Sequence, residues 1–146
     1  MQRYFITLAA SLALSTAPAL AMQNPCTLLK PAEVQKALGV PVAAGNFEAV
    51  QGGKSCRWME NDSSGGYQNV YVQLSGDGPF MLKVAKDSGA KPVSGIGVPA
   101  VFWGGNVYML KGNTAVLVGI THGEQNNTAV DPNLPALAKL VYGRVH

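Results

Sequence analysis

The sequence predicts an α+β fold, with an antiparallel sheet of about four to six strands and two or three short helices packed on one face. Three observations support this fold class. Segments of alternating apolar and polar residues, typical of half-buried strands, recur along the chain. Short turns rich in glycine and asparagine join these segments, so hairpins suffice and no parallel crossover is required. Helical spacing of apolar residues is confined to three short segments.

Three helices are predicted. The first begins at Pro31, because proline suits the first helical position, and ends before Gly39. Val34 and Leu38 share its buried face, four residues apart. The second covers 79–88, and the third runs from about 132 to 141 after the capping residue Asp131.

The strands are predicted in hairpins. Residues 42–50 give a weak strand signal, and 55–60 alternate clearly before the turn-forming segment 61–66. The returning strand is 67–75, and another is expected near 99–103 after a glycine-rich connection. The strongest hairpin signal is NVYML, at 106–110, followed by a Lys-Gly-Asn turn and TAVLVGIT, at 114–121.

The N-terminus has the pattern of a cleaved secretory signal. Arg3 is the only charge in the first 21 residues, 5–17 is an apolar run, and 19–21 reads Ala-Leu-Ala, an A-x-A cleavage pattern. The run is shorter than a membrane-spanning helix requires. We therefore expect a signal peptide at 1–21 and a single α+β domain at 22–146, exported to the periplasm or, alternatively, to the extracellular medium.

Length and charge limit the classes of function. Removal of the first 21 of 146 residues would leave 125, enough for one modest core. Without Arg3, ten basic and eight acidic residues remain, a net charge of +2. This small excess does not favour nucleic acid as a partner, and no later segment is long and apolar enough to suggest a membrane span.

Cys26 and Cys56 are expected to form a disulfide. A lipid anchor would need a small residue just before the cysteine, whereas Gln23-Asn24-Pro25 precedes Cys26. A reactive thiol would need a base and a zinc site would need regularly spaced ligands, but the chain has only two scattered histidines. An even number of cysteines in an exported chain is most simply explained by pairing. No metal or other cofactor is expected.

Several short motifs together resemble a group of small bacterial cell-envelope domains, secreted or lipid-anchored and largely of unknown function. The motifs are PCTLLKPAEVQKALG at 25–39, CRW at 56–58, VSGIGVPAVFW at 93–103 with its following hairpin, and a last helix LPALAKLVYGRV. Lys30 replaces the threonine usual in that group, and Val98-Pro99 replaces a segment beginning with aspartate. The resemblance implies an exported α+β domain and supplies no catalytic residue.

Aromatic residues suggest a binding surface. Trp58, Tyr67 and Phe102 also lie on predicted strands, and most strand aromatics are expected to fill the core. The alternative is that Tyr71, Trp103 and Tyr108 face outward with Arg57 beside them, as in a partner-binding surface. Alternation along the strand places Arg57 outward if Trp58 points inward.

The sequence supports three classes of function. The first is a non-enzymatic module that binds a protein, peptide or envelope component through a sheet face or its loops. The second is a hydrolase-like enzyme with a site near His122 and Glu124, although no nucleophile has a recognisable setting beside them. The third is a carrier that holds a small apolar ligand between sheet and helices. Enzymatic activity therefore stays open, and the binding module is preferred.

Overall fold

The computed structural model describes residues 22–61, 68–123 and 128–146, and the predicted signal peptide lies outside this part of the chain. The prediction of an antiparallel α+β fold is confirmed. The strands are β1 (Asn46–Val50), β2 (Gly53–Met59), β3 (Asn69–Ser75), β4 (Lys91–Pro92), β5 (Ala100–Trp103), β6 (Asn106–Lys111) and β7 (Thr114–Thr121). The helices are the short 3-10 turn η1 (Pro25–Thr27), α1 (Pro31–Leu38), α2 (Gly78–Asp87) and α3 (Leu134–Arg144).

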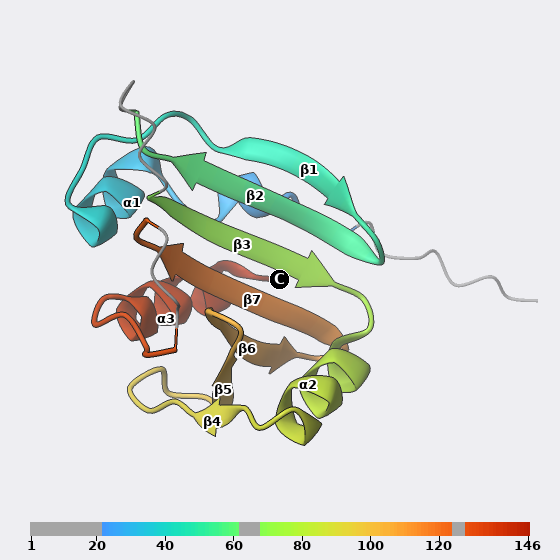
Figure 1. The fold of residues 1–146 in the computed structure, drawn as a ribbon. Helices are drawn as coiled ribbons and strands as arrows, with labels where there is room; N and C mark the ends of the chain where they lie inside the picture. Colours follow the sequence, from blue (N-terminus) through green and yellow to red (C-terminus); the bar gives the residue numbers. More distant parts are fainter. Residues whose placement is uncertain (1–21, 62–67, 124–127) are drawn as a thin grey trace, which may run out of the picture.

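All seven strands belong to one antiparallel sheet in the order β1-β2-β3-β7-β6-β5-β4 (Figure 1). The prediction of four to six strands was therefore too low. The missing strand is β4, whose two residues lie in the segment predicted as a connection and pair with Val101 and Phe102 of β5. A strand this short has no alternation of its own, so only its neighbour reveals it.

The helices cover both faces of the sheet, which corrects the prediction that they share one. η1, α1 and α3 pack against the core face, where Leu28, Val34 and Val141 meet the side chains of the central strands. α2 packs on the opposite face, where its Ala85 joins a second cluster with Leu117 and Tyr108. Figure 1 shows α2 at the other end of the sheet from α1.

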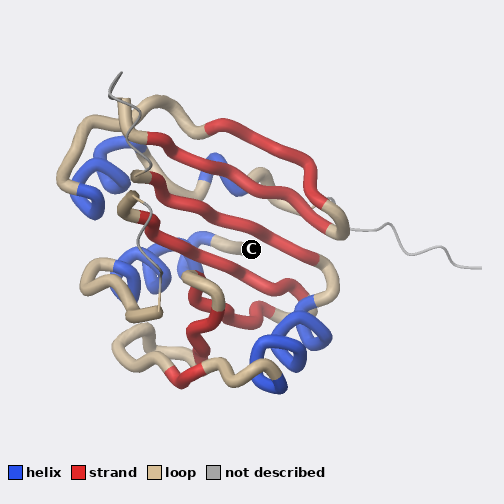
Figure 2. The backbone as a smooth tube through the Cα atoms, viewed as in Figure 1, coloured by secondary structure: helices blue, strands red, loops and turns tan. Residues whose placement is uncertain are grey.

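Local sequence explains where the helices begin and end (Figure 2). α1 ends at Gly39, whose φ of 75° is the left-handed conformation that glycine adopts readily. α3 begins two residues later and ends three residues later than predicted, because Asp131 and Pro132 form the turn that precedes it. Asp131 accepts a hydrogen bond from the backbone N–H of Asn133 at 2.7 Å. Ala138 is fully buried on α3, and Leu134, Leu137 and Val141 share its buried face.

The disulfide between Cys26 and Cys56 is present and joins η1 to β2. It closes a loop with a sequence separation of 30 residues. Cys56 is fully buried beside Trp58, so the bridge lies at the edge of the main core. It ties the segment that leads into α1 to the sheet.

Candidate functional site

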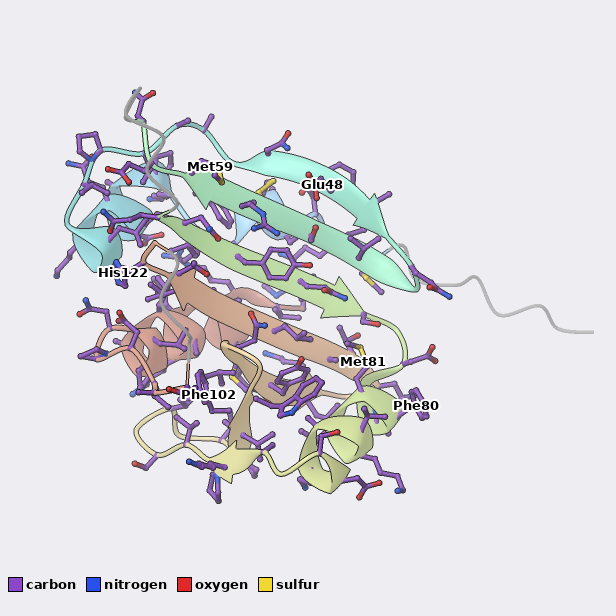
Figure 3. All side chains as sticks on the ribbon, viewed as in Figure 1. Glu48, Met59, Phe80, Met81, Phe102 and His122 are labelled. Carbon is purple, nitrogen blue, oxygen red and sulfur yellow. A yellow bond between two sulfur atoms is a disulfide. The ribbon has the colours of Figure 1, made fainter. Side chains whose placement is uncertain are left out.

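The face of the sheet that carries α2 is partly uncovered, and we call it the open face. Strand register places one row of residues straight across it, perpendicular to the strands. In strand order, this row consists of Asn46, Arg57, Tyr71, Gly119, Asn106 and Trp103. Figure 3 labels Glu48 and Met59, which belong to the same face of β1 and β2. Three of the four predicted surface residues therefore lie in one row.

Arg57 and Tyr71 form the first pair on the open face. They are directly opposite each other on β2 and β3, and the guanidinium carbon of Arg57 lies 5.0 Å from the centre of the Tyr71 ring. The Tyr71 hydroxyl donates to the amide oxygen of Gln73 at 2.6 Å. Trp58 is only 1% exposed and points into the core, so the prediction that strand alternation would turn Arg57 outward is confirmed. Among the described residues, no carboxylate forms an ion pair with Arg57.

Trp103 and Tyr108 form the second pair. Their ring centres are 6.1 Å apart with an interplanar angle of 56°, a tilted contact favoured between aromatic rings. Trp103 is 38% exposed, whereas Tyr108 is only 7% exposed because the α2 cluster covers it. Burial raises the pKa of Tyr108, and the nearby Tyr71 hydroxyl raises it further. Tyr108 therefore supports the surface from below rather than facing outward as predicted.

Gly119 lies between the two pairs in this row. A Cβ atom at this position would lie 2.2 Å from Oδ1 of Asn106, so only glycine lets the Asn106 side chain lie in its observed position over β7. The Asn106 amide donates to the carbonyl of Gly104 at 3.1 Å. Sequence reasoning missed both residues. The glycine inside the TAVLVGIT strand was the available signal, because such a glycine marks a close approach of another group.

His122 lies at the end of β7, away from the aromatic pairs (Figure 3). Its Nδ1 is 2.8 Å from Oε1 of Gln68, and its Nε2 is 2.8 Å from Oδ2 of Asp131. Both partner atoms are oxygens, and both ring nitrogens are engaged. Glu124, the predicted partner of His122, lies outside the described residues. No free ring nitrogen is left for a substrate in this arrangement, so the geometry does not favour a catalytic base here.

Glu60 lies next to Gln68, the hydrogen-bond partner of His122. Its backbone N–H donates to the carbonyl of Gln68 at 2.9 Å, which places Glu60, Gln68 and His122 side by side at one end of the sheet. Oε2 of Glu60 is buried without a hydrogen-bond partner. Nevertheless, the described residues contain no group of three histidine, cysteine or acidic side chains placed to hold a metal ion.

A pocket of about 360 Å³ lies between α1 and α3. It is lined by Glu33, Lys36, Ala37, Asn133, Ala136, Leu137 and Leu140. Charged and amide groups therefore share the wall with apolar ones, and the pocket lies between two helices rather than between the sheet and the helices, where a carried apolar ligand was expected.

Comparisons of this chain with protein-family models, with curated proteins and with solved structures found no match. Within the described part of the chain, no helix is long and apolar enough to cross a membrane.

Proposed function

We propose that the protein is a non-enzymatic binding module that holds a protein, peptide or other envelope component on its open face. The observation that carries this proposal is the common placement of Arg57, Tyr71 and Trp103 in one row, with Tyr108 beneath them. Tyrosine, tryptophan and arginine are enriched at binding hot spots. Tyrosine and tryptophan offer large contact areas at low entropic cost, and arginine adds a planar charged group with several hydrogen-bond donors.

The shape of the open face supports contact with a large partner rather than with a small molecule. Gly119 and Asn106 separate the Arg57–Tyr71 pair from Trp103 along the row. Aromatic groups on separate strands of one sheet face suit a surface that buries a partner's side chains and hydrogen-bonds through its rim. The amides of Gln73 and Asn106 provide polar groups beside the rings.

Export to an envelope compartment is part of the same proposal. The Cys26–Cys56 disulfide is typical of oxidising compartments, and it agrees with the signal-like segment at 1–21. The resemblance to envelope domains adds to this interpretation. Between the two candidate destinations, the periplasm is preferred to the extracellular medium.

The proposal is tested by affinity capture from an extracytoplasmic extract of the organism that makes the protein. The immobilised protein is compared with its Trp103→Ala and Arg57→Ala variants. Phe80→Ala is the matched control, because Phe80 is a 67% exposed aromatic residue on α2 that projects away from the sheet (Figure 3).

We expect at least one component to be retained by the unchanged protein and by Phe80→Ala, and to be lost from both open-face variants. A single hot-spot truncation costs about 2 kcal/mol or more, so retention should fall at least about tenfold. Equal retention by all four proteins would contradict binding through the open face.

A further inference from the structure

The two edges of the sheet differ in how well they are protected. β4 has two residues, one of them Pro92, and proline cannot donate a backbone hydrogen bond to a further strand. β1 has five residues without proline and is the outermost strand at the other edge, paired only with β2 (Figure 1). Four of its residues are exposed, and Phe47 is 46% exposed. The edge at β1 therefore offers backbone groups and an apolar side chain for pairing.

The outward-facing backbone groups of β1 can be identified from the hydrogen bonds of β2. Met59 accepts from the N–H of Ala43 at 3.0 Å, so the backbone groups of Met59 face the β1 side. Backbone groups of alternate residues along a strand point the same way, so every second residue of β2 also faces β1. The β1 partners of these residues are Asn46, Glu48 and Val50, whose backbone groups therefore face β2. The N–H and C=O groups of the intervening residues, Phe47 and Ala49, consequently point away from the sheet.

We propose that β1 pairs antiparallel with β1 of a second copy of this chain, about a two-fold axis at Phe47. The two Phe47 residues then exchange backbone hydrogen bonds, and their rings meet on the core-face side of the sheet. On the open face, Asn46 of each copy faces Glu48 of the other. Within one chain, the Asn46 amide already donates to the Glu48 carboxylate at 3.5 Å. In the dimer, the amide of one copy would face the carboxylate of the other.

The other two-fold registers are less complementary. An axis at Glu48 would place the two Glu48 carboxylates directly opposite each other, which is destabilising. An axis at Ala49 would oppose Glu48 to the apolar Val50 and Phe47 to Gln51 in the turn. Only the axis at Phe47 gives Glu48 a hydrogen-bond donor and brings the two exposed rings together.

This association is distinct from partner binding, because Phe47 lies on the face opposite to Arg57 and Tyr71. A contact limited to one strand is smaller than a standard stable interface, so the dimer is weak. The dimer would place two open faces on the same side of a continuous sheet, and a partner with two copies of the bound feature would gain from their linkage.

The test is sedimentation velocity of the 22–146 chain from about 10 µM to about 1 mM, a range that covers weak association. We expect a concentration-dependent shift from monomer toward dimer. Phe47→Lys places two ammonium groups at the axis, and the dissociation constant should rise at least about tenfold, equal to about 1.4 kcal/mol. Phe80→Lys makes the same change of charge away from the edge and should leave it unchanged. A monomer throughout, or equal weakening by both variants, would overturn the proposal.

A crosslinking experiment tests the register. Asn46→Cys and Glu48→Cys variants, mixed under mild oxidation, should form a mixed disulfide dimer, because facing residues of this kind have Cα atoms about 4.5 Å apart. Both positions are on the face opposite to Cys56, so the native disulfide is not their neighbour. Faster crosslinking of Glu48→Cys alone would overturn the Phe47 axis. Neither experiment uses the open-face partner, so failure here leaves the binding proposal standing.

Discussion

The Arg144 guanidinium binds the Glu33 carboxylate through two hydrogen bonds of 2.7 Å and so joins the end of α3 to the start of α1. The same guanidinium donates to the carbonyl of Leu28 at 2.8 Å, and Glu33 also accepts from the backbone N–H of Lys30 at 2.8 Å. Lys30 makes no side-chain cap, and the Glu33 contact with the Lys30 backbone N–H is one half of a capping box. The two ends of the described chain meet at this point.

Because of this ion pair, we expect the protein to lose stability in acid. Hydrogen bonding to Arg144 lowers the pKa of Glu33 from 4.5 to about 2. A lowered pKa in the folded state stabilises the fold fully above the unfolded pKa, and this contribution disappears as the pH falls from about 4.5 to about 2. We expect Glu33→Gln to cost about 1 kcal/mol at pH 7, since both side chains are partly exposed and solvent weakens the pair. Urea unfolding checks this value, and the difference between the two proteins should shrink toward zero near pH 2.

We also expect the free energy of unfolding to depend on the Cys26–Cys56 disulfide. Replacement of both Cys26 and Cys56 by serine should lower the free energy of unfolding by about 3–4 kcal/mol, the value expected when a loop of this length is no longer closed in the unfolded chain. Chemical denaturation of the two proteins, with and without a reductant, measures the change. Reduction should affect the unchanged protein alone. An unchanged midpoint after complete reduction would show that the bridge does not hold η1 to β2.

Much of the fold was predictable because its signals are local. Hairpin turns, alternation and the proline and glycine at the ends of α1 each act within a few residues, and those elements appear where expected. The side of the sheet that α2 covers depends instead on distant contacts with Leu117 and Tyr108, which no local pattern encodes. For the same reason, the sequence indicated that Arg57 would turn outward but not that Asn106 would lie over Gly119. The partners of His122 were likewise set by tertiary contacts.

At Gly45, just before β1, there is no room for a side chain. A Cβ atom there would lie 2.6 Å from Sγ of Cys56 and 2.7 Å from Nε1 of Trp58, both held in the core. Gly45→Ala should therefore destabilise the protein by about 1–3 kcal/mol, the usual cost of overpacking. Gly143→Ala is the matched control: apart from its chain neighbours and the backbone of its own helix, no atom lies within 4 Å of the added methyl group, and alanine should stabilise α3 by about 0.5–1 kcal/mol. Thermal unfolding of both variants shows whether the two changes have opposite signs.

The raised pKa of Tyr108 affects the stability of the protein at high pH. Its pKa is raised above 10.0, first by burial and second by Tyr71. A raised pKa means that the folded protein keeps this proton when the unfolded chain has lost it, so Tyr108 makes the protein less stable as the pH rises above about 10. Tyr71→Phe removes the second cause and should lower the Tyr108 pKa without restoring it fully, because burial under α2 is unchanged. Titration of tyrosinate absorbance in Tyr71→Phe and Tyr108→Phe separates the two hydroxyls. If the Tyr108 pKa did not move in Tyr71→Phe, burial alone would account for its rise and Tyr71 would not act on it.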